Sequence, residues 1–248
     1  MSRTDLLHRI KTLVYAPDVL DPFTYADLLV QEQIIPAEKK AEAAAIVLTT
    51  PTALFLYGGA RLLVDKILQS GSDIVLWTQG EPQIQRAKCD TSKLLEMGDK
   101  THGSISALCE TDKITAIGNA LTNQALEGKN RVVIIDDKSH QLMRAYQAVL
   151  KLIEVEKRPV PHDIEYIWIR TNEKSNKKLP TGFESIEELN KFMEHRLKDM
   201  LNLENIPVYA KTLYLLDFDH TLFDTEKWFE TVQERIVSEV GSDSEPAA

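Results

Sequence analysis

The residue types best suited to chemistry in this sequence are aspartates that directly follow short apolar segments. Asp217 and Asp219 come after the apolar residues 213–216, with Thr221 two residues further on. One carboxylate can act as a nucleophile, and a second one nearby can transfer protons as a general acid and base. In an extended chain residues two apart point to the same side, so Asp217 and Asp219 can act on one bound molecule.

Two other apolar segments end in polar residues. Asp136 and Asp137 follow one of them, and Thr78, Gln79 and Gly80 follow the other. Ligands bind outside the carboxyl ends of the strands of an open α/β sheet, so these side chains are expected to meet in one crevice. Clustered carboxylates repel one another unless a cation neutralises them, and oxygen ligands of this kind suit Mg²⁺. The sequence therefore predicts a Mg²⁺ site at this edge of the sheet.

Four short apolar segments, rich in β-branched or aromatic residues, predict the strands that position these groups. They are residues 74–77, 132–135, 166–169 and 213–216. Segments of helical spacing alternate with them, at residues 60–69, 84–97, 113–126 and 141–155. This alternation predicts βαβ units and an α/β fold with a Rossmann-like open parallel sheet. Residues 170–182 are predicted to be a surface loop and residues 185–203 a further helix.

The motifs resemble those of the haloacid dehalogenase superfamily. Residues 213–225 are similar to its first motif, an apolar strand followed by Asp-x-Asp-x-Thr. Residues 73–80 are similar to its second motif, an apolar strand that ends in Thr or Ser, and residues 132–140 to its fourth, an apolar strand that ends in paired acids. Residues 56–68 are similar to the glycine-containing segment and helix that precede the second motif.

In the family the motifs follow one another from first to fourth, whereas in this chain the first motif comes last. Relative to the family, the order is therefore circularly permuted. The resemblance implies an α/β core at residues 51–228, with the nucleophile strand (residues 212–219) in the centre of the sheet. It also implies a small helical cap between the first and second motifs, where the permuted chain has its ends. Residues 1–50, whose apolar spacing is helical, and residues 229–240 would form this cap. The small, polar tail at residues 241–248 is predicted to be disordered.

The resemblance implies a role for each motif in a phosphohydrolase mechanism. Asp217 attacks phosphorus and forms an aspartyl-phosphate, and Asp219 protonates the leaving oxygen and later activates water. Thr78 and Gln79 bind the phosphoryl group of the substrate. The Mg²⁺ ligands that the resemblance implies are the carboxylates of Asp217, Asp137 and Asp136 and the backbone carbonyl of Asp219, with Asp137 preferred over Asp136 as a direct ligand.

The third motif of the family is a single lysine that compensates the charge of the phosphate and the nucleophile. Lys113 is assigned this role because it begins a predicted helix ahead of the fourth-motif strand. Lys88 and Lys129 remain alternatives, and an ordinary solvated lysine is the competing interpretation of Lys113. His220, inside the first motif, either faces the substrate or packs beside the site.

Composition and charge disfavour several classes of protein. The chain has 248 residues, 43% of them apolar, which is enough to form a hydrophobic core that needs no disulfides or metal ions for stability. Its net charge of -9 disfavours nucleic acid and anionic membranes as partners. Two cysteines, Cys89 and Cys109, give no disulfide framework or metal-ligand spacing. Without a signal-peptide core or an apolar stretch of membrane-spanning length, a cytoplasmic protein is predicted.

The expected activity is Mg²⁺-dependent hydrolysis of a small phosphorylated metabolite, a phosphate monoester. A phosphomutase or a phosphonate-cleaving enzyme remains an alternative within the superfamily, whereas a dehalogenase has no leaving oxygen for Asp219 to protonate. Two alternatives from other classes are a non-catalytic regulatory module and a phosphoacceptor domain of the response-regulator type. The identity of the substrate and the oligomeric state do not follow from the sequence.

Overall fold

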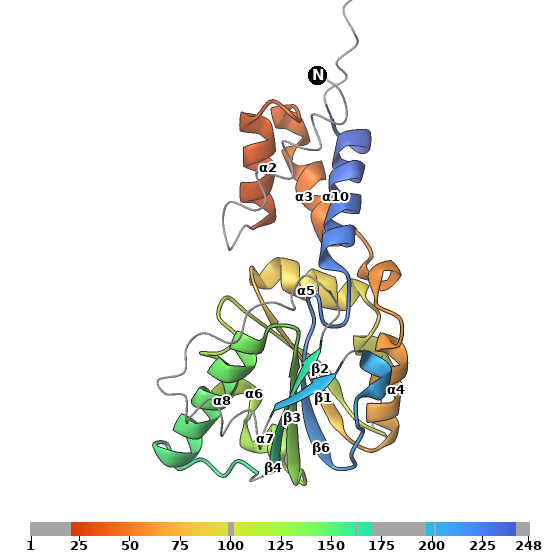
Figure 1. Cartoon of the computed structure of the whole chain (residues 1–248). Helices are drawn as coiled ribbons and strands as arrows, with labels where there is room; N and C mark the ends of the chain where they lie inside the picture. Colours follow the sequence, from red (N-terminus) through yellow and green to blue (C-terminus); the bar gives the residue numbers. More distant parts are fainter. Residues whose placement is uncertain (1–20, 99–101, 162, 170–196, 201, 242–248) are drawn as a thin grey trace, which may run out of the picture.

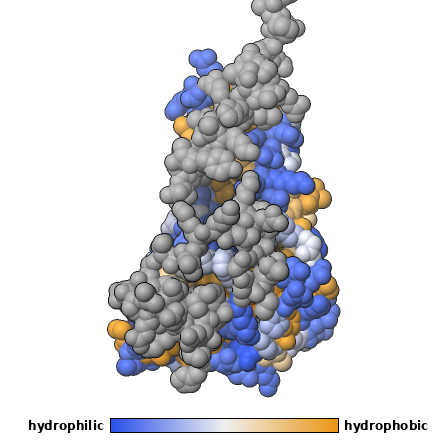
Figure 2. Space-filling view, viewed as in Figure 1, coloured by the Kyte–Doolittle hydropathy of each residue, from blue (hydrophilic) through white to orange (hydrophobic). Residues whose placement is uncertain are grey.

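The protein was analysed as a computed structural model, which describes residues 21–98, 102–161, 163–169, 197–200 and 202–241. No described helix is long and apolar enough to cross a membrane. On the face shown in Figure 2, hydrophilic side chains predominate among the described residues, with smaller hydrophobic patches between them.

The described residues form one open sheet of parallel strands in the order β2-β1-β6-β3-β4-β5. The strands are β1 (Asp73–Gln79), β2 (Ile105–Glu110), β3 (Arg131–Asp136), β4 (Asp163–Ile169), β5 (Leu197–Met200) and β6 (Thr212–Asp217). Although β6 is the last strand in the chain, it lies between β1 and β3, the central position expected for it (Figure 1). All of its residues are buried, as in a parallel strand covered on both faces. The predicted α/β fold with an open parallel sheet is confirmed.

Helices cover both faces of the sheet, and alternate residues of the strands contribute to two hydrophobic cores. One core joins the side chains of β6 residues Tyr214 and Leu216 to α4 (Ala60–Gln69) and α5 (Pro82–Thr91). The other joins residues of the opposite face, such as Leu215, to the helices on that side. These are α6 (Ile117–Ala120), α7 (Asn123–Leu126) and α8 (Ser139–Glu154). The short 3₁₀ helices are η1 (Ala37–Lys39), η2 (Thr52–Phe55), η3 (Leu95–Met97) and η5 (Leu203–Asn205).

Three helices from the two ends of the described chain pack together beyond the carboxyl end of the sheet (Figure 1). They are α2 (Pro22–Gln31), α3 (Lys40–Thr49) and α10 (Thr225–Glu239). The rings of Tyr25 and Phe229 lie 5.8 Å apart, and the indole N–H of Trp228 donates to the carbonyl of Thr50 at 3.2 Å. These contacts join segments that are far apart in sequence. The division of the chain into a core and a separate cap stays a prediction.

Two strands were missed because they lie at the edges of the sheet. The residues of β2 are mostly half-buried and form no apolar run, since this strand has only one neighbour. Residues 197–200, predicted to be helical, instead form β5, which pairs with β4. The predicted helix at residues 113–126 is also wrong in part, because it divides into α6 and α7. The predicted loop at residues 170–182 and the tail from residue 242 lie outside the described residues.

Candidate functional site

Three neighbouring strands bring the predicted residues together at the carboxyl end of the sheet. Trp77 of β1 pairs with Asp217 at the end of β6, so Thr78 lies one residue beyond this pair. Ile135 of β3 pairs with Leu216, which places the aspartates that follow it beside Asp217. The parallel register thus places the three motifs at the carboxyl end of the sheet, although they are far apart in the chain.

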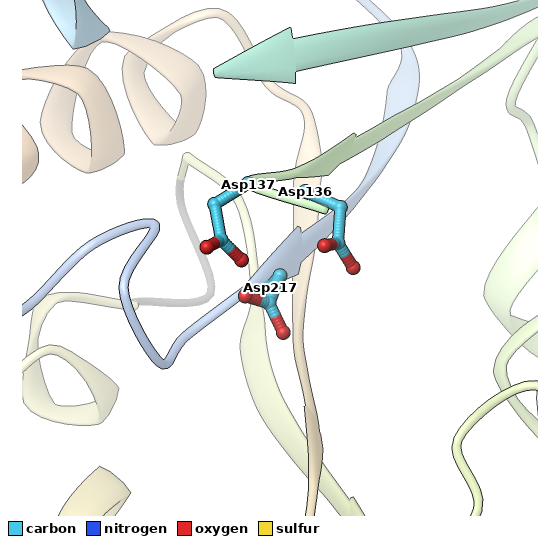
Figure 3. Close-up of side chains that lie close together, drawn as sticks. All are labelled: Asp136, Asp137 and Asp217. Carbon is cyan, nitrogen blue, oxygen red and sulfur yellow. The ribbon is translucent and has the colours of Figure 1, made fainter. Parts of the chain in front are cut away.

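Asp136, Asp137 and Asp217 form a compact carboxylate cluster. One carboxylate oxygen from each of the three lies within 4.8 Å of the others, and Figure 3 shows the side chains grouped at the ends of β3 and β6. Both oxygens of Asp136 accept hydrogen bonds, one from the backbone N–H of Lys138 at 2.8 Å and one from Lys113. The Oδ1 atom of Asp137 is buried and accepts no hydrogen bond from a described group. Asp137 therefore has an oxygen available for a cation.

Lys113 bridges two members of this cluster. Its Nζ atom lies 2.5 Å from Asp136 Oδ2 and 2.5 Å from Asp217 Oδ1, and the side chain is 3% exposed. The indole N–H of Trp77 donates to the carbonyl of Lys113 at 3.0 Å and fixes the backbone. Lys113 was expected to begin a helix, but it lies in the turn before α6. The interpretation of Lys113 as a solvated surface lysine is wrong, because the residue is buried.

Asp219 lies outside the carboxylate cluster and has its own set of donors. Its Oδ2 atom accepts from the hydroxyl of Thr78 at 2.9 Å. Its Oδ1 atom accepts from Lys88 at 2.6 Å and from Thr225, the first residue of α10, at 3.0 Å. The Thr78 hydroxyl is also 3.0 Å from the side-chain oxygen of Gln85, so its single proton is shared between two acceptors. Thr78 thus orients Asp219 in this structure.

Lys88 is a site residue that sequence reasoning named only as an alternative to Lys113. It is 5% exposed, and its Nζ atom lies 5.4 Å from the ring centre of Phe223 and 5.2 Å from that of Trp228. The aromatic faces and the Asp219 carboxylate together stabilise this buried charge. No spacing in the sequence distinguishes Lys88 from other helical lysines. Lys129, the other alternative, forms an ion pair with Asp73 at the opposite end of the sheet.

The turn after Asp217 holds the two acidic segments together. The hydroxyl of Thr221 donates to Asp217 Oδ2 at 2.8 Å and accepts from the backbone N–H of Asp137 at 3.0 Å. His220 has φ of 61°, a left-handed conformation that tightens the turn. Thr221, the last residue of the Asp-x-Asp-x-Thr pattern, therefore fixes the position of Asp217 relative to β3.

A pocket of about 270 Å³ opens onto these groups. It is lined by Gln79, Gly80, Lys113, Lys138, Gln141, Asp217 and Asp219. A larger hollow, of about 470 Å³, lies over β1 and β2 and is lined by none of the four acidic site residues. The smaller pocket is the candidate site, because Asp217 and Asp219 line it and it lies at the carboxyl end of the strands.

The protonation of the acids depends on how far each is neutralised. Burial raises the pKa of Asp137 to about 8, and the nearby charges of Asp217 and Asp136 contribute to the rise. Burial also raises the pKa of Asp217 to about 7, although Lys113 opposes this change. Burial acts in the same direction on Asp219, but Lys88 and the two threonine hydroxyls outweigh it and hold its pKa below 3.8. The cluster around Asp217 therefore lacks positive charge, whereas Asp219 does not.

Comparisons with known proteins do not identify this site. No family model matches the chain, and neither the curated proteins nor the solved structures contain a match to it.

Proposed function

We propose that this protein is a Mg²⁺-dependent phosphohydrolase that uses Asp217 as its nucleophile and hydrolyses a small phosphorylated metabolite. The proposal rests above all on the carboxylate cluster, in which Asp137 has a buried oxygen without a donor. Buried carboxylates in close contact are unfavourable unless a cation joins them, and such groups are concentrated at functional sites.

The residues of the cluster fit a Mg²⁺ ion. Asp217 and Asp137 would be direct ligands together with the backbone carbonyl of Asp219. Both oxygens of Asp136, like those of Asp217, already accept a hydrogen bond, whereas Oδ1 of Asp137 accepts none from a described group, which supports the preference for Asp137 over Asp136. When bound, the ion would polarise a phosphoryl oxygen and offset negative charge in the transition state.

The nucleophile is oriented before substrate binds. Thr221 and Lys113 each hold one oxygen of Asp217, so the carboxylate cannot rotate freely. In the first step an Asp217 oxygen forms a bond to phosphorus while the bond to the leaving oxygen breaks, and Lys113 compensates the accumulating negative charge. The leaving oxygen takes its proton from Asp219, which must bind that proton before the step, because its donors keep it ionised at rest.

The second step reverses the role of Asp219. The Asp219 carboxylate removes a proton from water, and the water oxygen attacks phosphorus, releasing phosphate and free Asp217. Lys88, Thr78 and Thr225 favour the ionised form that this step requires. A bond from Thr78 to a phosphoryl oxygen, as expected from the resemblance, would require its hydroxyl to turn away from Asp219. The presence of Asp219 beside the nucleophile favours hydrolysis over a phosphoacceptor domain that keeps its phosphoryl group.

The test is release of phosphate from para-nitrophenyl phosphate and a panel of metabolite phosphates, with Mg²⁺ and with EDTA. Asp217→Asn should lower the rate at least about a thousandfold, since it removes the nucleophile. Asp163→Asn is the matched control, because this aspartate lies at the amino end of β4, far along the strand from the site. Circular dichroism would verify that both variants fold.

Several outcomes contradict the proposal. Phosphate release that is unchanged in Asp217→Asn would exclude this residue as the nucleophile. Folded wild-type protein that binds Mg²⁺ and hydrolyses none of the substrates would favour a regulatory module. Lasting phosphorylation of Asp217 without phosphate release would instead favour a phosphoacceptor domain.

A further inference from the structure

Two of the residues that line the pocket carry exposed hydrogen-bond donors. They are Lys138, directly before α8, and Gln79, at the end of β1. The two buried lysines of the site are occupied, because Lys113 neutralises Asp136 and Asp217 and Lys88 neutralises Asp219. Lys138 forms no ion pair with any described carboxylate. Its positive charge acts on nearby Asp137, whose pKa it tends to lower, but no described carboxylate pairs with the ammonium group.

The backbone of Lys138 is fixed although its side chain is exposed. Its N–H donates to Asp136 at 2.8 Å, and its carbonyl accepts from the N–H groups of Gln141 and Leu142 at 2.9 and 3.3 Å. These bonds attach the residue to both the carboxylate cluster and the first turn of α8. The ammonium group therefore extends from an ordered position on the pocket wall.

A line of hydrogen bonds sets the orientation of the Gln79 amide. Arg144 donates to the Asp112 carboxylate at 3.3 Å and to the side-chain oxygen of Gln141 at 3.3 Å. Since a guanidinium can only donate, it determines which end of the Gln141 amide is the oxygen. The Gln141 amide nitrogen then donates to the side-chain oxygen of Gln79 at 3.3 Å. This arrangement leaves the amide N–H₂ of Gln79 as a donor with no acceptor among the described side chains.

We propose that Lys138 and Gln79 bind a second anionic group of the substrate, a carboxylate or a second phosphate. This inference rests on the proposed function, which places the reacting phosphoryl group beside Asp217 in the same pocket. Lys138 and Gln79 offer a positive charge and an oriented N–H₂ group, and both favour an oxyanion over a neutral or cationic group. The pocket volume of about 270 Å³ limits the distance between the two anionic groups to a few atoms.

Binding to the Asp217→Asn protein tests the anion site without turnover. The probes are three phosphate esters with the same three-carbon chain: propyl phosphate, 3-(phosphonooxy)propanoate and propane-1,3-diyl bisphosphate. Calorimetry in the presence of Mg²⁺ would give the affinity for each ester, with and without the additional change Lys138→Met. We expect Lys138→Met to weaken binding of an anion-ended ester about tenfold more than binding of propyl phosphate.

Lys151→Met is the control for this experiment. Lys151 is an exposed lysine in the last turn of the same helix, so its removal changes the net charge equally but should not change the relative affinities. Gln79→Leu should give the same selective loss as Lys138→Met, at about threefold. The ester that loses most affinity shows whether the site prefers a carboxylate or a second phosphate.

The result that overturns the anion site is an equal effect of Lys138→Met on all three esters, or no effect on any. Hydrolysis of the same esters by the protein with Asp217 intact tests the proposed function separately. Selective binding without hydrolysis would support the anion site and contradict the phosphohydrolase, whereas hydrolysis without selectivity would do the reverse.

Discussion

The two ends of the sheet differ in how their acidic side chains are neutralised. At the amino end, each of three acids has its own cation. The pairs are Asp73 with Lys129 at 2.6 Å, Asp163 with Arg131 at 2.5 Å, and Glu165 with Lys198 at 2.7 Å. Hydrogen bonds from Lys129 and Ser104 outweigh burial and lower the pKa of Asp73 below 3.8. This end of the sheet needs no ligand to balance its charge.

At the carboxyl end the acids exceed the cations that contact them. Lys88 forms an ion pair with Asp219, and Lys113 forms ion pairs with both Asp136 and Asp217. Asp137 forms no ion pair with a described residue, and its pKa is raised to about 8 by burial and by its acidic neighbours. Native proteins tolerate such unfavourable arrangements where function requires them. The difference between the two ends supports the proposal that a cation binds at the carboxyl end.

The largest effect on this comparison is expected from removing the shared cation. Lys113→Met leaves Asp136 and Asp217 buried, close together and unpaired, which should lower the free energy of unfolding by about 3–5 kcal/mol. Urea unfolding in EDTA would measure the loss. The two acids can take up protons as the pH falls, so the loss should shrink towards about pH 4. A loss below about 1 kcal/mol at neutral pH would show that these acids are not neutralised mainly by Lys113.

A smaller change in the free energy of unfolding, of opposite sign, is expected from replacing Asp137, which forms no ion pair with a described residue. Asp137→Asn replaces a buried carboxyl group, which must take up a proton to stay uncharged at neutral pH, by an amide of the same shape that can donate to Asp217. In metal-free protein this should raise the free energy of unfolding by about 1–3 kcal/mol. The same variant should lose the stabilisation that Mg²⁺ gives to the wild type, which is measurable as a shift in Tm on addition of Mg²⁺. Destabilisation of the metal-free protein would contradict the absence of a partner for Asp137.

The strands that position the site were predictable because they are buried on both faces. The segments of β1, β3, β4 and β6 read as continuous apolar runs, and the structure confirms each of them. β2 could not be found in this way, because an edge strand with half-buried residues lacks such a run. Pairing at an edge depends on backbone groups, which leave little trace in the sequence.

The acids of the site were predictable from their position after the strands, but their partners were not. Asp217 and Asp219 follow one apolar run directly, so parallel strands must bring them to the ligand-binding edge. Lys88 reaches Asp219 only because of the way α5 packs on the sheet, and the amides of Gln79 and Gln141 meet only because the end of β1 lies beside the start of α8. Such contacts depend on tertiary geometry, and no spacing in the sequence encodes them.

The dependence of stability on pH should also differ between metal-free wild type and Asp137→Asn. The folded wild type keeps a proton on Asp137 up to about pH 8, whereas the unfolded chain loses it near the ordinary pKa of 3.8. The folded state therefore binds more protons in this range, and the free energy of unfolding should fall as the pH rises through it. Asp137→Asn should make the fall shallower, by about 3–4 kcal/mol between pH 5 and 8. Equal slopes in EDTA would contradict the raised pKa.

The smallest effect is expected at the amino end of the sheet. Arg131→Met leaves Asp163, whose side chain is 53% exposed, free to be solvated by water. The expected loss is about 1 kcal/mol or less, part of it from the Arg131 guanidinium that lies 3.8 Å from the centre of the Tyr209 ring. Salt should screen the ionic part, so urea unfolding at about 0.05 M and about 1 M NaCl should give a smaller loss at high salt. The loss in Lys113→Met should change less with salt, because its charges are buried. A loss in Arg131→Met as large as that in Lys113→Met would mean that both ends of the sheet depend equally on their ion pairs, and the contrast between them would then not identify the functional end.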